Sequence, residues 1–365
     1  MHFDNTYFLI AITFLTSFVI CNVSIPSIIK VAKDKGLVNV PGDRTVHKYH
    51  TPTLGGLAIF AGLLISLCLF ADADKIAELQ FIIAACIIVF FVGLKDDVLV
   101  IAPLVKLTGQ IFSALILVVF GNLRFTNLHG FFGIFSIDYV SSILISVFFI
   151  IVVINSFNLI DGIDGLAAGI GFVTSLTYCI WFYLFGETQY ALLSVCMTGS
   201  LLAFFRFNVF GSKNKIFMGD TGSLILGLIL AILTIKFNEL NINAYYSLNK
   251  YAITSAPAVS FGILIIPLFD TLRVVFIRLV IRKSLFKADK NHIHHGLLRL
   301  GQSHLKATMV LVLVNIGFIV FSFYCKFISI RRLFLFLLLL AMILAYIPFI
   351  IAEKRQKKIK KIKAK

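Results

Sequence analysis

Long apolar runs separated by short polar segments recur from one end of this chain to the other. Most runs reach the roughly 17 residues that a helix needs to cross the hydrocarbon core of a bilayer. Backbone groups cannot stay unpaired in hydrocarbon, so runs of this length predict helices. Eleven spans are predicted, at 7–29, 54–71, 79–94, 104–120, 140–158, 165–185, 190–207, 221–237, 251–272, 307–325 and 333–352. The expected fold class is all-α, a polytopic integral membrane protein with one domain over residues 1–365.

The composition agrees with a membrane protein and argues against a nucleic-acid-binding one. Of the residues, 59% are hydrophobic and 14% are charged, whereas a soluble domain carries about 25% charged residues. The net charge of +16 comes from basic residues in short loops between spans, a pattern typical of membrane topology. The six cysteines lie in apolar runs without zinc-ligand spacing, so they are expected to be small buried hydrophobic residues.

The distribution of lysine and arginine predicts the orientation in the membrane. With eleven spans, 26 of the 33 basic residues fall on the side that holds the C-terminal tail 353–365. Basic residues accumulate on the cytoplasmic side, so we expect an external N-terminus and a cytoplasmic C-terminus. The basic tail is expected to anchor this topology and to attract anionic lipid. The external segment 121–139 is a candidate short hairpin without evident chemistry.

Aspartates at the ends of the predicted spans are the main chemical signal. Carboxylates are costly near hydrocarbon and usually serve a function there. Several carboxylates at one membrane face form a site for a hard divalent cation and, through it, for phosphate groups. The aspartates of this kind all fall on the predicted cytoplasmic side: Asp96, Asp97, Asp161, Asp164, Asp220, Asp270 and Asp289.

Two of these motifs combine several polar groups. In GLKDD, the adjacent Asp96 and Asp97 repel each other unless a cation or a proton lies between them; the alternative is a solvated helix end. In NSFNLIDGIDGLAAG, helical spacing would place Asn155, Asn158 and Asp161 on one face. The alternative there is a helical hairpin turn in which an aspartate serves as an N-cap.

Three further motifs supply groups for an anion. FMGDTGS opens a predicted span with Asp220, and a helix N-terminus with small residues binds anions; an ordinary N-cap is the alternative. KADKNHIHHGLL lacks zinc-ligand spacing, so its histidines are better explained as hydrogen-bond partners of phosphate: His292, His294 and His295. PGDRTVHKYHTPTLGG adds Arg44 and His47, either as anion contacts or as ordinary positive-inside residues.

Taken together and in this order, the five motifs resemble those of the polyprenyl-phosphate N-acetylhexosamine-1-phosphate transferase superfamily, glycosyltransferase family 4. They span roughly residues 41–300. The HIHH form is similar to the bacterial undecaprenyl-phosphate GlcNAc-1-phosphate transferase branch, which begins O-antigen, enterobacterial common antigen, teichoic acid or capsule synthesis. The alternative branch, the phospho-N-acetylmuramoyl-pentapeptide transferases of peptidoglycan synthesis, usually has three consecutive histidines.

The resemblance implies an enzyme of the bacterial inner membrane with a cytoplasmic active site. It would transfer HexNAc-1-phosphate, with GlcNAc-1-phosphate expected, from a UDP-N-acetylhexosamine to undecaprenyl phosphate and release UMP. It implies Mg²⁺, replaceable by Mn²⁺, with Asp220 as a ligand. The implied catalytic residues are Asp96, Asp97, Asp161 and Asp164, and the implied substrate contacts are Asn158, His292, His294, His295, Arg44 and His47. A homodimer is left open.

Two observations limit these expectations. Thr45 stands where the family often has lysine beside Arg44, which removes support for a phosphate contact at that position. A cation-coupled transporter is the alternative from another class, but transporters usually place charges near the midplane, often with two related halves. In this chain the carboxylates lie at one face, and the sequence shows no internal repeat.

Overall fold

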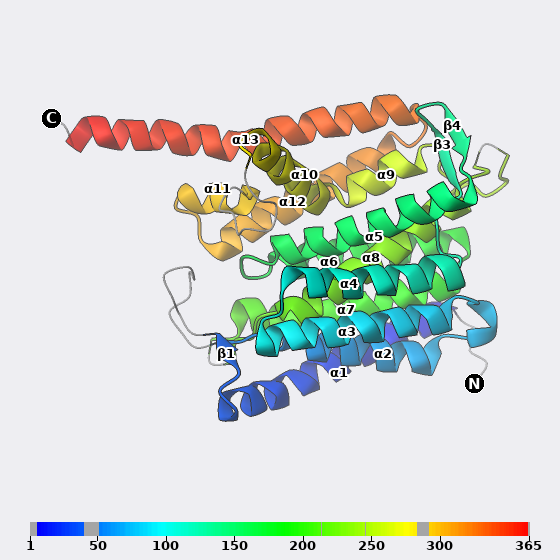
Figure 1. Ribbon diagram of the computed structural model, residues 1–365, viewed down its shortest axis with the longest axis horizontal. Coiled ribbons are helices and arrows are strands. Elements are labelled where there is room, and N and C mark those ends of the chain that lie inside the picture. The colour runs from blue at the N-terminus through cyan, green and yellow to red at the C-terminus, as the bar shows by residue number, and fades with distance from the viewer. Residues whose placement is uncertain (1–5, 40–50, 213, 245, 283–291, 364–365) are drawn as a thin grey trace.

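A computed structural model describes residues 6–39, 51–212, 214–244, 246–282 and 292–363 of the chain, with side chains as far as Lys354 except that of Asn39. The longer helices lie side by side along one long axis and form a bundle (Figure 1). The α-helices are α1 (Thr6–Asp34), α2 (Gly55–Phe70), α3 (Leu79–Leu99), α4 (Pro103–Leu115), α5 (Tyr139–Ile160), α6 (Leu166–Phe185), α7 (Thr188–Phe210), α8 (Gly219–Leu240), α9 (Ala256–Ile263), α10 (Ile265–Val280), α11 (Ile293–Arg299), α12 (His304–Tyr324) and α13 (Ile330–Lys363).

Short elements lie at the two ends of the bundle. A 3₁₀ turn covers Ala73–Lys75, and α4 continues as a π-helical turn over Ile116–Phe120. Strands β1 (Val38–Asn39) and β2 (Thr51–Pro52) pair antiparallel, as do β3 (Asn127–Phe131) and β4 (Ile134–Ser136). The two pairs lie at opposite ends of the bundle (Figure 1). The β3–β4 pair confirms the hairpin predicted within 121–139.

Eight helices in the described part of the chain are long and apolar enough to cross a membrane, and α2 is a shorter apolar helix. The all-α polytopic fold is thereby confirmed, while the predicted number of eleven spans stays a prediction. Among the cysteines, five are buried and all six are free, as predicted. Cys68 differs from the expectation because it is exposed.

The span predicted at 251–272 is a broken helix, not a single one. Helix α9 ends at Ile263, and α10 starts at Ile265 and continues to Val280. Pro267 lacks the N–H that would bond to the Ile263 carbonyl, and its ring crowds that carbonyl. The freed oxygen accepts a hydrogen bond from buried Asn315 Nδ2 on α12, at 3.4 Å. A neighbouring helix therefore satisfies the break at membrane depth.

Helix α8 lies at the centre of the bundle. Burial covers 83% of its apolar stretch, against 22% for both α1 and α13. Small residues allow this close packing: a Cβ added at Gly56 of α2 would lie 2.2 Å from the Gly222 nitrogen of α8. A Cβ added at Gly93 of α3 would lie 2.5 Å from the Thr221 Cα. Close backbone approach at small residues is a general means of packing membrane helices.

This packing predicts that Gly56→Ala is destabilising. The added methyl group would force α2 away from the start of α8, at a cost of about 1–3 kcal/mol. Gly317→Ala on α12 is the matched control, because nothing lies within 4 Å of a Cβ there. We expect a lower thermal midpoint for Gly56→Ala in detergent and an unchanged or higher one for Gly317→Ala. Equal midpoints for the two variants would contradict the close approach.

Candidate active site

The start of α8 is fixed by an extended segment that precedes α2. Phe217 N donates to Pro52 O at 2.8 Å, and Gly55 N donates to Phe217 O at 2.9 Å. Gly219 has φ of 72°, and a Cβ there would lie 2.0 Å from the Thr53 carbonyl oxygen. Only glycine suits both the left-handed backbone and the space. The start of α8 is thus held next to β2.

The predicted contacts Arg44 and His47 lie outside the described residues. The strands that flank their loop are described, and β1 and β2 hold the two ends of the loop together. Because β2 leads directly into the contacts with the start of α8, these loop ends lie at the same end of the bundle as Asp220. We call this end of the bundle the site end.

The Asp97 side chain caps the N-terminus of α8 from a different helix. Asp97 Oδ1 accepts a hydrogen bond from Asp220 N at 2.7 Å. Asp97 Oδ2 accepts from Thr221 N at 2.9 Å and from Thr221 Oγ1 at 2.5 Å. The sequence left an ordinary N-cap within FMGDTGS as an alternative, but α8 has no local side-chain cap. A carboxylate here satisfies free N–H groups and complements the positive end of the helix dipole.

Lys106 on α4 joins the two other carboxylates of this cluster. Its Nζ lies 2.8 Å from Asp220 Oδ1 and 3.2 Å from Asp96 Oδ2. Asp96 Oδ1 accepts a further bond from Ile101 N at 2.9 Å. The lysine side chain is 14% exposed, so this ammonium group neutralises neighbouring carboxylates in a largely water-excluded position.

Asn158, at the end of α5, connects the same groups. Its Oδ1 accepts from Lys106 Nζ at 3.4 Å, and its Nδ2 donates to Asp220 Oδ1 and, at 2.9 Å, to Ser223 Oγ. Asn155 faces elsewhere, because its Nδ2 donates to Gln110 Oε1 on α4 at 2.7 Å. Of the two asparagines in the motif, Asn158 therefore belongs to the site and Asn155 joins two helices.

The loop between α5 and α6 is tied down through Asp164. Asp164 Oδ2 lies 2.7 Å from Lys215 Nζ and 3.1 Å from His304 Nδ1, and Thr308 Oγ1 donates to the Asp164 carbonyl at 2.7 Å. Against the opposing effect of burial, the hydrogen bonds from His304 and Lys215 hold the pKa of Asp164 below its usual value. Asp164 thus fixes the loop against α12.

Asp161, three residues earlier, has the opposite environment. Its carboxylate makes no hydrogen bond or ion pair with any residue that the structure describes. Burial, together with the charges of Asp220, Asp97 and Asp164, raises the pKa of Asp161 well above its usual value. It also follows the C-terminus of α5, where the helix dipole disfavours a negative charge. An unpaired carboxylate facing three others is a place where a cation would be stabilising.

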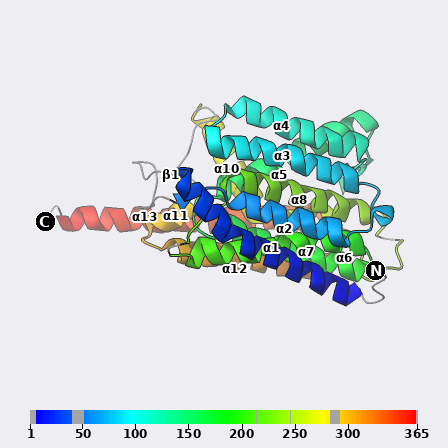
Figure 2. The same cartoon turned by 90° about the horizontal axis from the view of Figure 1, so that it is seen from below.

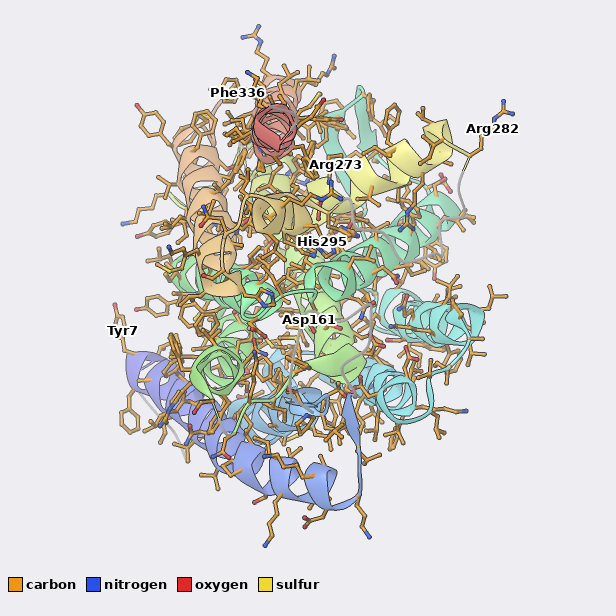
Figure 3. The ribbon with its side chains drawn as sticks, turned by 90° about the vertical axis from the view of Figure 1, so that its left-hand side faces the viewer. Tyr7, Asp161, Arg273, Arg282, His295 and Phe336 are labelled. Carbon is orange, nitrogen blue, oxygen red and sulfur yellow. The ribbon has the colours of Figure 1, made fainter. Side chains whose placement is uncertain are left out.

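The histidine helix α11 lies against this loop. Asp270 anchors its start: Asp270 Oδ2 lies 2.9 Å from His292 Nδ1, and Asp270 Oδ1 accepts from Ile293 N at 3.0 Å. A Cβ added at Gly162 would lie 2.8 Å from His294 Nε2, and His294 Nδ1 is buried without a hydrogen-bond partner. Burial and the neighbouring histidines lower the pKa of His294 to about 3, which keeps its ring neutral. Figure 3, in which the site end faces the viewer, shows His295 above Asp161 near the middle of the bundle.

The structure brings together most of the residues that the sequence singled out. Asp96, Asp97, Asn158 and Asp220 share one network, and the Gly162 contact joins the Asp161–Asp164 loop to α11. Asp289 lies outside the described residues. The contact residues that sequence reasoning missed include Lys106, Ser223, Lys215 and His304. Lys106 carried a usable signal, since a lysine inside an apolar run is itself rare.

The donor set suits a hard cation such as Mg²⁺ in its chemistry. The carboxylates and the Asn158 amide are oxygen ligands of the kind that Mg²⁺ prefers. Burial and, after it, the neighbouring carboxylates raise the pKa of Asp161. Lys106 Nζ lies where two of these carboxylates face each other. Within the described residues, however, no three acidic, histidine or cysteine side chains are arranged as a metal site.

Comparisons with known proteins point to one group of enzymes. The family model described as Glycosyl transferase family 4 matches residues 79–238. The chain is 31% identical to decaprenyl-phosphate N-acetylglucosaminephosphotransferase of Mycobacterium tuberculosis, over 83% of this chain and 79% of that protein. It is 29% identical to a Bacillus subtilis protein named "Probable undecaprenyl-phosphate N-acetylglucosaminyl 1-phosphate transferase", over 96% and 95%. It is also 29% identical to undecaprenyl-phosphate alpha-N-acetylglucosaminyl 1-phosphate transferase of Escherichia coli, over 78% and 75%.

Proposed function

Because this chain belongs to glycosyl transferase family 4, among its polyprenyl-phosphate N-acetylglucosamine-1-phosphate transferases, we propose that it transfers GlcNAc-1-phosphate from UDP-GlcNAc to undecaprenyl phosphate. The products would be undecaprenyl-diphospho-GlcNAc and UMP, in the first membrane step of a cell-surface polysaccharide. The observation that carries the proposal is the carboxylate network around Lys106, at one end of a membrane-embedded bundle. Such a site can meet a soluble nucleotide sugar and a lipid phosphate together.

The proposed reaction exchanges one diphosphate linkage for another, so it needs no additional energy source such as ATP. An oxygen of the lipid phosphate forms a bond to the phosphorus that carries the sugar, and the bond from that phosphorus to the oxygen of UMP breaks. One diphosphate linkage is made and one is broken. Catalysis of such a transfer rests on positioning and on neutralising phosphate charge. Among the motif residues that the structure describes, no serine, cysteine or lysine pairs with a base as an activated nucleophile, which favours one-step transfer.

The described residues divide into two roles in this proposal. Asp97 uses both carboxylate oxygens to hold the start of α8, so we assign it to positioning. Asp96 would accept the remaining proton of the lipid phosphate, whose second pKa is about 6. Asp164, through Lys215 and His304, and Asp270, through His292, would position the loop and the histidine helix. His294 Nδ1, buried and unpartnered, is available to the diphosphate.

Mg²⁺ fits this proposal as the resident cation. Asp220 and Asp161 would hold it with Asn158, and Lys106 would then pair with Asp96. When bound, the ion supplies charge neutralisation for the diphosphate. Without the ion, two negatively charged substrates would meet a cluster of carboxylates. The homodimer raised by the sequence analysis stays a prediction.

We further propose that the site end faces the cytoplasm of a bacterial inner membrane, on the strength of the 26 basic residues assigned to that side. In a cysteine-free background, Leu99→Cys at the site end should resist a membrane-impermeant maleimide in cells with a permeabilised outer layer. Phe132→Cys, in the hairpin at the other end, should react. Leu99 is 67% exposed and Phe132 is 79% exposed, which makes the pair a fair comparison. The reverse labelling pattern would refute the orientation.

The proposed reaction is tested with purified protein, undecaprenyl phosphate, Mg²⁺ and a panel of UDP-sugars, with UMP release as the readout. We expect UDP-GlcNAc or a closely related acetamido sugar to be used, with no release of UMP when the lipid is left out. Turnover of UDP-MurNAc-pentapeptide instead would move the chain to the peptidoglycan branch. UMP exchange without lipid would indicate a two-step mechanism. No turnover with any sugar, together with cation-driven transport in vesicles, would overturn the proposal.

A further inference from the structure

An apolar groove of about 300 Å³ lies between α10, α11, α12 and α13. Its walls include Phe269, Leu297, Val314 and Ala345. Three other wall residues are partly open to the outside of the bundle: Val310 is 44% exposed, Ile347 is 42% exposed and Ile351 is 48% exposed. The groove therefore opens on the surface that α12 and α13 present to lipid.

Basic residues lie at the site end of this groove. Lys354 follows Ile351 by one helical turn on α13, and Lys306 precedes Val310 by one turn on α12, so each lies on the face that lines the groove. Arg299, the last residue of α11, adjoins the wall residue Leu300. All three side chains are exposed. With the neighbouring Glu353, these residues give this end of the groove a net positive charge.

We propose that the groove binds one acyl chain of an anionic phospholipid, with the lipid phosphate at Arg299, Lys306 and Lys354. The apolar walls match the chain, and the positive end matches the headgroup in charge. The chain's own C-terminal tail is a poor occupant, because its many lysines carry the same sign as this end of the groove. A zwitterionic lipid offers the same acyl chain but lacks the net charge.

The groove is connected to the histidine helix by α13. Pro348 lines the groove, and the ring of the next residue, Phe349, lies 4.9 Å below the Arg273 guanidinium and 5.9 Å from that of Arg299. A Cβ added at Gly296 of α11 would lie 3.0 Å from this ring. Arg273 in turn bonds Asp270 Oδ1 at 3.1 Å, and Asp270 holds His292.

A bound acyl chain would therefore fix the spacing of α11, α12 and α13, and with it the position of His294 against Gly162. We infer that anionic phospholipid raises the activity of the site; this second step rests on the proposed function, whereas lipid binding itself does not. Figures 1 and 2 show the C-terminal part of α13 extending beyond the bundle. Lipid at the groove would hold this helix where it leaves the bundle.

Binding is tested without any activity assay. Delipidated protein is titrated with phosphatidylglycerol or phosphatidylcholine, and retained lipid is counted by native mass spectrometry. We expect preferential retention of phosphatidylglycerol, lost in Ala345→Phe, which fills the groove, and kept in Met342→Phe. Met342 is 41% exposed on the same helix and does not line the groove. Lys354→Glu should weaken phosphatidylglycerol binding by about fivefold or more, since one basic residue near an anionic surface contributes about that factor.

The outcomes separate the possible sources of lipid. Equal retention of the two phospholipids, or loss of binding in Met342→Phe as well, would overturn the proposal. Displacement of phosphatidylglycerol by undecaprenyl phosphate, with a raised KM for that acceptor in Ala345→Phe, would assign the groove to the acceptor chain and also overturn it. If Ala345→Phe does not fold, the test uses Lys354→Glu and Lys306→Glu: unchanged phosphatidylglycerol retention in both variants would overturn the proposal. Intact lipid binding without any UMP release would contradict the proposed function and leave the lipid site standing.

Discussion

Replacing Asp220 by asparagine is expected to lower kcat by about a hundred- to a thousandfold, the usual effect of removing one charge-stabilising group from a polar active site. Asp220 lies at the start of the most buried of the eight candidate membrane spans, bonds Asn158 and Lys106, and adds to the negative charge around the unpaired Asp161. An amide keeps its shape but supplies no charge to a cation. UMP release measured across a Mg²⁺ titration should show the loss, and EDTA should abolish the activity of the unchanged protein.

The control for this prediction is Asp138→Asn. Asp138 is exposed and caps α5 through a 3.0 Å bond from Ser141 N, and asparagine caps helices about as well as aspartate. Asp138→Asn should retain full activity. In size-exclusion chromatography both variants should elute alike, which would show that Asp220→Asn is folded. Near-normal turnover of Asp220→Asn, or full activity of the unchanged protein in EDTA, would show that Asp220 does not serve a metal.

Replacing Asp161 by asparagine is expected to abolish most of the activity and, in EDTA, to raise the thermal midpoint. In the folded protein the charged form of Asp161 is disfavoured, which raises its pKa above the unfolded value near 4. Ionised Asp161 therefore costs stability, and this cost grows as the pH rises through the folded pKa. The variant removes the cost, so its advantage should be largest at high pH and should vanish in acid.

Asp164→Asn provides a matched variant with the opposite expected sign. Its carboxylate is paired with Lys215 and His304, which lowers its pKa. The stability that it contributes is present above the unfolded pKa and is lost as the pH falls through the folded pKa. At neutral pH, Asp164→Asn should lower the thermal midpoint measured by differential scanning fluorimetry. A similar fall for Asp161→Asn would mean that Asp161 has a partner and would remove the electrostatic argument for a cation.

Much of the fold could be predicted from the sequence because membrane spans are encoded locally, in the length and apolarity of each run. The break between α9 and α10, after Ile263, could not be predicted in this way. Its cause, Pro267, is visible in the sequence, but proline occurs in many membrane helices. The break also depends on Asn315, whose side chain on a different helix donates a hydrogen bond to the freed Ile263 carbonyl.

The candidate site was predictable in its members but not in its connections. Aspartates at span ends stand out because charge is rare in apolar surroundings. The sequence could not show that Asp97 caps α8 while Asp161 stays unpaired, because that difference arises from which helices meet. Lys106, which the sequence analysis did not single out, lies between Asp96 and Asp220.

The central position of α8 has a consequence for the order in which the protein is made. The chain is synthesised from its N-terminus, so α2 and α3 enter the membrane long before the helix that fills the space between them. Until α8 arrives, Gly56 and Gly93 lack the backbone that packs closely against them, and Asp97 has no helix end to cap. A ribosome stalled before residue 219 would leave an incompletely packed intermediate in which Asp97 has no α8 to cap. Biogenesis of this protein therefore includes a late step in which the active site and the core are completed together.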